Sequence, residues 1–503
     1  MHALIYGGSE RPDTSEIEHG VAEYSKTLPN YIRAYGAHKI ATSLRKNGWD
    51  VEVLDFLPAW SLDQLKEYTV KRITNKTKFI GFSLTFRPKS RLFIGVMNDL
   101  IAWVRKEYPS VKVLAGSQSY FAITDIDADY HLVGWAENAV EKCLEGNLLD
   151  FNQFKDHLIL HCNDKYPAYP REDLAAEYEE RDYLRPDEPL HIELARGCKF
   201  KCTFCAFPVL GVKGDYTRSA EGFRKELETN YEKWGTTKYI LIDETVNDRP
   251  EKIKKFADAT KGLPFQPSMV GFARGDLTVV QEDYWDDFIR LGFTGHFYGI
   301  ETFNPPSMKL IRKAMEVNKL QEGLLRADEY FSERSLYKGH ISLIAGLPKD
   351  TPETLDKTSD WIRKNWHTRR NSSSMFALQI KSDFFDGHDT HSDLDRNCHE
   401  YGYRDMTPEE YGDIIPSRHQ RIDGNMYWIN DADNTNWWQM YNYSNQYTNA
   451  TFHEQGFPVW AIPYWKMLYT DEEIDKIQGK PWANFLPPDF VDELVSEYIS
   501  QKL

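Results

Sequence analysis

Short strand patterns alternate with helix patterns along the first 385 residues, and this alternation restricts the chain to α/β folds with parallel sheets. In residues 1–147 the strand patterns are short apolar runs, and helix-compatible segments separate several of them. The predicted strands are Ala3–Tyr6, Val51–Leu54, Phe79–Leu84, Val111–Ala115 and Tyr130–Val133, and the predicted helices are Ala37–Gly48, Leu92–Glu107 and Ala136–Leu144. We expect an open, Rossmann-like sheet whose ligand loops lie beyond the carboxyl ends of its strands.

A second series of strand–helix units fills residues 186–385. Six strand patterns follow one another here: Pro189–Leu194, Tyr239–Glu244, Pro267–Arg274, Gly295–Glu301, Gly339–Pro348 and Met375–Ile380. The intervening sequence is compatible with helices, as in 220–233, 281–291 and 352–365. Because such units connect with a right-handed crossover, we predict a (β/α)6 partial TIM barrel with its functional groups at the strand carboxyl ends.

Two segments lie outside these series. Residues 148–185 are polar and rich in acidic and tyrosine residues, and we interpret them as a linker. Residues 386–503 are too aromatic for a disordered tail, and their tryptophans are Trp428, Trp437, Trp438, Trp460, Trp465 and Trp482. We predict a mainly helical cap that closes the barrel and shapes the substrate pocket; the alternative is a packing domain remote from the chemistry.

Composition excludes several classes of protein. The 61 Lys and Arg residues against 77 Asp and Glu give a net charge of −16, which disfavours a surface that coats nucleic acid or a membrane. The sequence enters a strand at once without a signal-peptide pattern, and no run of 18 apolar residues follows, so we expect a cytoplasmic protein. Three of the six cysteines (Cys143, Cys162 and Cys398) are scattered, which does not indicate a disulfide framework.

The other three cysteines, Cys198, Cys202 and Cys205, are clustered on the loop after the first barrel strand. Closed structural zinc sites use four protein ligands, whereas a [4Fe–4S] cluster held by three cysteines leaves one iron free for another ligand. The triplet therefore predicts a metal site with an open coordination position. The alternatives are a Cys3His zinc site with His191 as fourth ligand, or three unrelated core cysteines.

The cysteine loop resembles the signature of the radical S-adenosylmethionine (SAM) superfamily, which has this cysteine spacing and an aromatic residue before the last cysteine, here Phe204. The resemblance implies a [4Fe–4S] cluster whose free iron chelates SAM. An electron from the cluster, supplied by a reductant such as flavodoxin or ferredoxin, then cleaves SAM to methionine and a 5′-deoxyadenosyl radical that abstracts hydrogen from a substrate.

The same resemblance assigns groups at later strand ends to SAM. Asp243 and Glu244 follow the second barrel strand, where the family presents groups to the SAM amino group. Arg274 ends the third strand and would meet the SAM carboxylate, for which its guanidinium fork is suited. Glu301 belongs to a Gly-Ile-Glu-Thr phrase and would meet the ribose hydroxyls or the methionine end, while Ile344 would contact adenine.

Residues 1–147 resemble the cobalamin-binding domain that precedes the barrel in one class of radical SAM enzymes. The resemblance lies in the phrase 44–55 and in residues after the predicted strands, and it implies cobalamin contacts from Ser83, Thr85, Gly116 and Gly134. The Asp-x-His-x-x-Gly motif that supplies a cobalt ligand elsewhere is absent, so no histidine from this motif binds cobalt. The alternative is a domain that keeps this fold without a corrin.

The resemblance thus predicts a radical SAM enzyme that uses cobalamin to transfer a methyl group to an unactivated carbon. The alternative within the class is a rearrangement or oxidation without bound cobalamin. The alternative outside it is a non-catalytic iron–sulfur or zinc protein. The sequence does not identify the substrate. A small molecule, a peptide and a nucleobase are equally compatible with it.

Overall fold

The structure is a computed structural model that describes residues 1–8, 33–85, 91–118, 123, 125–145, 150–154, 156–165, 175–205, 217–313, 315–368, 370–381, 392–416, 425–455, 472 and 488–503. The chain divides into two compact units. The first contains Met1–Leu190, Glu221–Thr236 and Leu486–Leu503, and the second contains His191–Ala220 and Thr237–Phe485. None of the helices in the described ranges is long and apolar enough to cross a membrane.

The first unit is built on a seven-stranded sheet with the strand order β2-β1-β3-β4-β5-β7-β6. The strands are β1 (His2–Gly7), β2 (Asp50–Leu54), β3 (Thr77–Ser83), β4 (Lys112–Ser117), β5 (Tyr130–Val133), β6 (Asn152–Phe154) and β7 (His157–His161). All five predicted strands are present, and every pair is parallel except β6 with β7. The predicted α/β class with an open Rossmann-like sheet is confirmed. Residues 148–185, interpreted as a linker, contribute β6 and β7 to this sheet.

Helices of the first unit follow its strands. They are α1 (Tyr35–Lys46), α2 (Leu62–Arg72), α3 (Arg91–Glu107), α4 (Val140–Leu144), α5 (Cys162–Lys165), most of α6 (Ala220–Trp234) and α18 (Pro488–Lys502). On α1 the spacing of Ala37, Ala41 and Leu44 places these residues on one face, where they join the core under β1 and β2. We did not predict α2, which begins with a capping box between Ser61 and Gln64.

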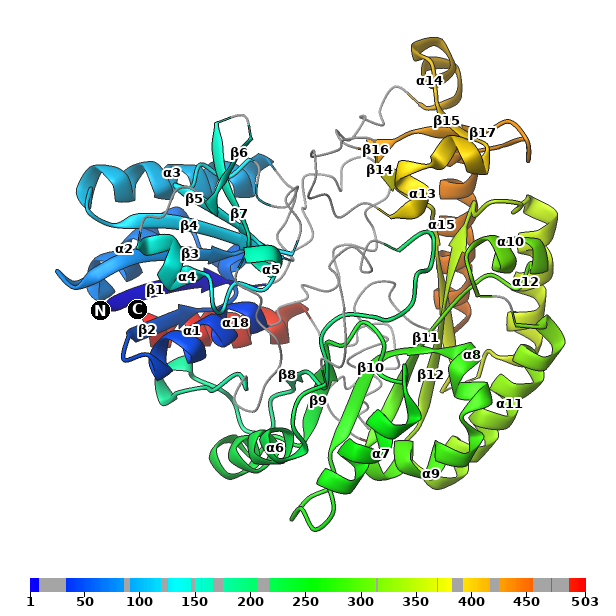
Figure 1. Ribbon diagram of the computed structural model, residues 1–503, viewed down its shortest axis with the longest axis horizontal. Helices are drawn as coiled ribbons and strands as arrows, with labels where there is room; N and C mark the ends of the chain where they lie inside the picture. Colours follow the sequence, from blue (N-terminus) through cyan, green and yellow to red (C-terminus); the bar gives the residue numbers. More distant parts are fainter. Residues whose placement is uncertain are drawn as a thin grey trace. The chain divides into compact units, whose positions relative to one another are not determined.

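Helix α18 lies beside β2, the edge strand of this sheet (Figure 1). Lys502 donates from Nζ to the Val53 carbonyl oxygen over 2.8 Å, and the Tyr498 hydroxyl accepts the Asp55 N–H over 2.9 Å. Unpaired backbone groups on an edge strand invite pairing with another chain. The last helix of the chain therefore satisfies and protects the outer strand of the first sheet.

The second unit is built on a six-stranded sheet with the order β13-β12-β11-β10-β9-β8 (Figure 1). The strands are β8 (Leu190–Ile192), β9 (Lys238–Leu241), β10 (Ser268–Arg274), β11 (Phe293–Glu301), β12 (Lys338–Ala345) and β13 (Ser372–Ala377). The pairs from β9 to β13 are parallel. Each strand overlaps one of the six predicted barrel strands, so their carboxyl ends share one edge of the sheet.

Helices pack against one face of this second sheet. They are α7 (Pro250–Ala259), α8 (Gly275–Val280), α9 (Trp285–Leu291), α10 (Pro305–Leu310), α11 (Val317–Arg334) and α12 (Pro352–Asn365). Outward-facing residues of β11 form the contacts: the His296 ring lies 4.8 Å from that of Phe331 on α11, and the Tyr298 ring lies 6.1 Å from that of Trp366 after α12. The opposite face of β11 carries Phe297, Gly299 and, at its end, Glu301.

The C-terminal extension contains helices and short strands. These are α13 (Asp393–Arg396), α14 (Pro408–Ile414), α15 (Trp437–Gln455), β14 (Ile380–Lys381), β15 (Tyr403–Asp405), β16 (Asn425–Met426), β17 (Trp428–Asn430) and β18 (Thr435–Asn436). Helix α15 covers the edge strand β13, because Thr448 Oγ1 bonds both the N–H and the carbonyl oxygen of Met375 at 3.0 Å. Trp460, Trp465 and Trp482 lie outside the described residues.

Candidate active site and cofactor pocket

Cys198, Cys202 and Cys205 lie on the loop that follows β8. All three are free thiols of intermediate exposure, and the Cys205 N–H donates to the Cys202 carbonyl oxygen over 3.1 Å, which folds the loop back on itself. Within the described ranges, no three His, Cys, Asp or Glu side chains form a ready-made metal site. The donor set nevertheless suits iron, because accessible thiols on one short loop are the ligands that iron–sulfur clusters use.

Two carboxylates after β9 support the start of this loop. Asp243 accepts the backbone N–H groups of Leu194 and Ala195 over 2.8 Å each, and Glu244 accepts that of Gly197 over 2.9 Å. Burial raises the pKa of Asp243 to about 6 and that of Glu244 to about 7. Both Asp243 oxygens are thus already engaged in holding the loop, and an interaction of either residue with SAM stays a prediction.

Three further contacts hold the middle of the cysteine loop. Arg312 donates from Nη1 to the Lys201 carbonyl oxygen over 3.0 Å. Thr203 donates from Oγ1 to the Leu310 carbonyl oxygen over 3.3 Å, and its own carbonyl oxygen accepts the Leu394 N–H over 2.8 Å. Leu394 belongs to α13, so the C-terminal extension bonds directly to the cysteine loop.

Arg274, at the end of β10, contacts the cysteine loop in two ways. Its Nη1 donates to Cys202 Sγ over 3.2 Å, and its guanidinium carbon lies 4.2 Å from the centroid of the Phe200 ring. The rest of the guanidinium binds Asp276 at 3.0 and 2.6 Å. Burial raises the pKa of Asp276, but the hydrogen bonds and charge of Arg274 outweigh it and keep that pKa below its usual range. If Arg274 binds the SAM carboxylate as predicted, that carboxylate and Asp276 would share one guanidinium.

Glu301, at the end of β11, is nearly buried and has a left-handed backbone with φ of 71°. Its Oε1 accepts a hydrogen bond from Lys313 Nζ over 2.8 Å, and the same ammonium donates to the Gly299 carbonyl oxygen over 2.8 Å. Left-handed backbone costs a non-glycine residue about 1 kcal/mol or more and persists where the surroundings enforce it. Lys313, which we did not single out in the sequence, binds the Glu301 side chain and the Gly299 carbonyl oxygen beside this backbone.

Strand β12 carries Ile344 to the same edge of the sheet. Ile344 is partly exposed and pairs in register with Phe376 of β13. The glycine that follows, Gly346, has φ of 91°, and a Cβ there would lie 2.6 Å from the Trp428 ring. This residue must be glycine because the C-terminal extension packs directly on the Gly-Leu-Pro loop.

The predicted barrel residues are therefore brought to one edge of the sheet. Strand register sets Arg274 beside Gly299, two residues before Glu301. Arg274 lies over Phe200, and the Lys313 ammonium that pairs with Glu301 lies 5.8 Å from the centroid of Phe204. Both ion pairs thus contact aromatic rings that alternate with the cysteines. Phe207 and Pro208, which follow the cysteines in the sequence, lie outside the described residues.

The first unit contains a pocket at the carboxyl edge of β3, β4 and β5. All four residues predicted to contact cobalamin, Ser83, Thr85, Gly116 and Gly134, line it. The pocket encloses about 640 Å³ of empty space, part of which is open to solvent. The remaining lining residues are mostly apolar: Ile5, Gly36, Ile40, Phe79, Gly81, Phe82, Leu114, Ser117, Gln118, Leu132, Trp135, Ala136, Glu137 and Val140. A sheet-edge pocket with a few polar groups is typical of cofactor sites in open α/β sheets.

Gly134 shows why the sequence has glycine at this edge. Its φ of 100° is left-handed, and a Cβ there would lie 2.6 Å from Asn163 Oδ1. That same oxygen accepts the Trp135 N–H over 2.9 Å, which fixes the loop after β5. Among the described residues that line the pocket there is no histidine.

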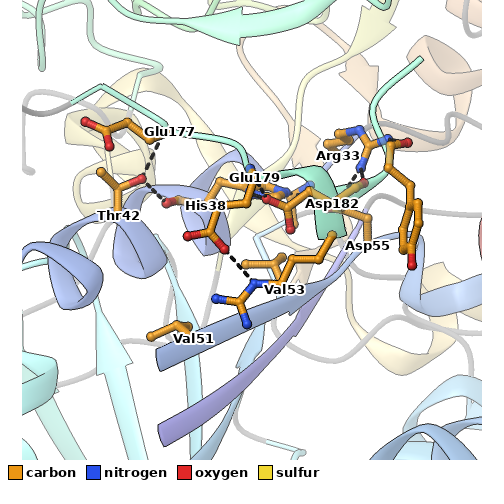
Figure 2. Close-up of polar contacts among 12 residues, drawn as sticks. Arg33, His38, Thr42, Val51, Val53, Asp55, Glu177, Glu179 and Asp182 are labelled. Carbon is orange, nitrogen blue, oxygen red and sulfur yellow. Dashed lines mark hydrogen bonds and ion pairs between the residues drawn. The ribbon is translucent and has the colours of Figure 1, made fainter. Parts of the chain in front are cut away.

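One wall of the pocket is α1, whose first turn is held by Asp55 at the end of β2. Asp55 accepts the Ala34 N–H over 2.8 Å and lies 2.9 Å from both His38 Nε2 and Arg33 Nη1 (Figure 2). Burial raises the pKa of Asp55, but His38 and Arg33 outweigh it, and the pKa lies well below its usual range. The dipole of α1 also favours an anion at this end of the helix. Asp55 ends the phrase 44–55, but no pattern in the sequence indicates that it holds α1.

Comparison with known proteins supports the fold. Residues 192–362 match the family model of the radical SAM superfamily. A structure of the radical SAM methyltransferase TsrM from Kitasatospora setae, with cobalamin and a [4Fe–4S] cluster bound, aligns over 81% of this chain and 81% of that chain, with a TM-score of 0.59 and 14% identity. The same enzyme with tryptophan substrate and a SAM analogue aligns over 75% and 73%, with a TM-score of 0.57 and 15% identity. No curated protein sequence matched this chain.

The match to the family model covers the cysteine loop and the strand ends that carry Asp243, Glu244, Arg274, Glu301 and Ile344. The cofactors of a radical SAM domain are a [4Fe–4S] cluster and SAM, and its reaction needs an external electron donor. The chain therefore contains a radical SAM domain in residues 192–362, the part that matches the family model.

Proposed function

We propose that this protein is a cobalamin-dependent radical SAM enzyme that transfers a methyl group to an unactivated carbon of its substrate. The observation that carries the proposal is the pocket of the first unit. Four residues chosen from the sequence as cobalamin contacts, on three different strand ends, all line this one pocket. A domain that had kept only the fold would have no need to keep an open pocket at these positions.

The fold of the TsrM structures adds support, because TsrM is a radical SAM methyltransferase and one of its structures contains cobalamin. In this chain, Ser83 and Thr85 would supply hydroxyl groups to the cofactor. Gly116 and Gly134 would let it approach the backbone. When bound, cobalamin supplies a transferable methyl group. The apolar residues Ile5, Ile40 and Leu132 would exclude water from its buried part.

In the second unit, Cys198, Cys202 and Cys205 would hold the cluster. When bound, a cluster held by three cysteines supplies an iron that binds SAM and an electron that cleaves it. Arg274 offsets negative charge on the Cys202 sulfur through its 3.2 Å contact. Arg274 would also bind the SAM carboxylate, and Glu301 would bind the ribose hydroxyls or the methionine end of SAM. Phe200 and Phe204 would limit access of water to the cysteine loop.

Hydroxocobalamin binding tests this proposal directly. The full-length protein, reconstituted anaerobically with iron and sulfide, is titrated with hydroxocobalamin and the change in the corrin absorption is followed. We expect saturable binding with one corrin for each chain. Binding that does not saturate, or none at all, would overturn the cobalamin assignment.

The methyl transfer itself is tested with SAM and dithionite. The cobalamin-loaded protein should produce 5′-deoxyadenosine from SAM, and with its substrate present it should also transfer a labelled methyl group to that substrate. Production of 5′-deoxyadenosine at the same rate in protein freed of cobalamin, together with a product that contains no added methyl group, would favour rearrangement or oxidation instead.

A further inference from the structure

The last helix of the chain bonds to the end of strand β2. The Tyr498 hydroxyl accepts the backbone N–H of Asp55 over 2.9 Å, and Lys502 Nζ donates to the carbonyl oxygen of Val53 over 2.8 Å. Lys502 is fully buried, and its ammonium lies 5.6 Å from the centroid of the Tyr498 ring. A buried cation on a helix end is costly unless it has a specific partner, so these contacts fix α18 in one place.

The residue that Tyr498 bonds is also the residue that holds α1. The Asp55 carboxylate accepts the N–H of Ala34, the N-cap residue of α1, whose own side chain cannot cap the helix. It also binds His38 in the first turns of α1 and Arg33 just before it (Figure 2). The Arg33 guanidinium lies 5.4 Å from the Tyr498 ring centroid. The Tyr498 hydroxyl therefore contacts Asp55, and the Tyr498 ring contacts Arg33.

Helix α1 forms one wall of the pocket, to which it contributes Gly36 and Ile40. A continuous chain of contacts thus runs from α18 through Asp55 and Arg33 to the pocket wall. We infer that the C-terminal helix sets the affinity of the first unit for cobalamin, with Tyr498 and Lys502 acting as positioning residues through Asp55 and α1. This inference rests on the proposed function of the pocket.

Two conservative variants test the inference in the full-length protein. Tyr498→Phe keeps the ring over Arg33 but leaves the Asp55 N–H without its acceptor. Lys502→Met keeps the length of the side chain but leaves the Val53 carbonyl oxygen without its donor. The matched control is Gln501→Ala, on the exposed face of the same helix. We expect the Kd for hydroxocobalamin to rise roughly three- to tenfold in each of the first two variants, as for loss of a buried hydrogen bond, and to stay unchanged in the control.

Hydrogen–deuterium exchange of the cobalamin-free proteins separates positioning from general stability. If α18 acts through Asp55, exchange should accelerate in residues 35–46 of α1 in both variants, with β3 and β4 unaffected. Unchanged affinity and unchanged exchange of α1 would overturn the inference. Uniformly faster exchange throughout the first unit would also overturn it, because the helix would then only stabilise the fold.

Failure of the proposed function gives a different result. If the unaltered protein does not bind hydroxocobalamin, the cobalamin assignment fails and with it the effect on affinity that we infer. Faster exchange confined to α1 in the variants would then still show that α18 is coupled to α1. Unchanged exchange of α1 would exclude this coupling as well.

Discussion

The guanidinium of Arg274 donates to the sulfur of Cys202 over 3.2 Å, which joins the end of β10 to the middle of the cysteine loop. Cysteine binds metals as the thiolate, and a cation at this distance would offset the negative charge of a metal-bound sulfur. The same side chain covers the Phe200 ring and binds Asp276. We therefore expect Arg274 both to stabilise a thiolate ligand and to bind a carboxylate of a molecule next to it.

Replacement of Arg274 by methionine should weaken SAM binding more than cluster binding. Hydrogen bonds to charged groups contribute about 1.5–3 kcal/mol, so we expect the Kd for SAM to rise by about tenfold or more. The Kd of Arg274→Lys for SAM should lie between those of the unaltered protein and Arg274→Met, because lysine keeps the charge but lacks the planar fork. Equilibrium binding to the reconstituted proteins measures this, with iron content determined on the same samples. Arg290→Met, which alters a partly exposed ion pair with Asp258, is the control. Unaltered SAM affinity in Arg274→Met would contradict the assignment.

Replacement of any one of the three loop cysteines by alanine should abolish the iron–sulfur cluster and the cleavage of SAM. The reason is that a cluster with one free iron has no protein ligand to spare. Iron and sulfide analysis and the yield of 5′-deoxyadenosine check this result. Cys398→Ala removes a partly exposed thiol outside the loop and should leave both unchanged. Formation of 5′-deoxyadenosine by Cys198→Ala at the original rate would refute the ligand set.

Lys313→Met should destabilise the second unit and also reduce SAM cleavage. Lys313 and Glu301 form a nearly buried ion pair, and loss of one partner leaves an uncompensated charge at a cost of about 3 kcal/mol. The Gly299 carbonyl oxygen would also lose its hydrogen bond from Lys313. Denaturant unfolding gives the stability, and Lys309→Met on the exposed side of α10 is the matched control. Equal free energies of unfolding of Lys313→Met and Lys309→Met would show that the Lys313–Glu301 ion pair does not stabilise the second unit.

Periodicity was sufficient to predict β1 to β5 of the first sheet and β8 to β13 of the second, because each of these strands is a short, mostly apolar run between turn residues. The same reasoning missed α2, whose sequence is rich in charged residues, and β6 and β7, which lie in a segment dominated by polar neighbours. Local pattern contains no information on the partners that bury such segments.

Site residues divide in the same way. The cysteines, Arg274 and Glu301 could be chosen because each ends a strand or belongs to a recognisable phrase. Lys313 and Asp55 could not, because their importance arises from partners that only the folded chain brings near. The Tyr498 hydroxyl lies 443 positions from the Asp55 N–H that it accepts, a separation that no local pattern reveals.

The free energy of unfolding of the first unit should rise with pH through the titration of Lys502. Burial lowers the pKa of Lys502 to about 8 from the ordinary value of 10.5, although Asp182, Asp55 and Glu52 act in the opposite direction. Between these pH values the unfolded chain binds a proton that the folded chain does not, so stability increases with pH, by at most about 3 kcal/mol. Below pH 8 both states hold the proton and the contribution is constant. Denaturant unfolding from pH 7 to 10 should show this slope in the unaltered protein and lose it in Lys502→Met. Parallel curves for the two proteins would contradict the assignment of the slope to Lys502.

Gly116→Leu should block cobalamin binding without unfolding the first unit. Gly116 lies in β4 on the lining of the pocket, and a Cβ there would have its nearest neighbours at 3.8 and 3.9 Å, which is ordinary contact. The larger side chain is therefore accommodated by the strand but fills space that the cofactor needs. We expect the affinity for hydroxocobalamin to fall by about tenfold or more and the free energy of unfolding to change by less than about 1 kcal/mol. Gly95→Leu, at a position on α3 with no neighbour within 4 Å, controls for an added leucine. Full affinity in Gly116→Leu, with a retained fold, would mean that cobalamin binds elsewhere on the chain.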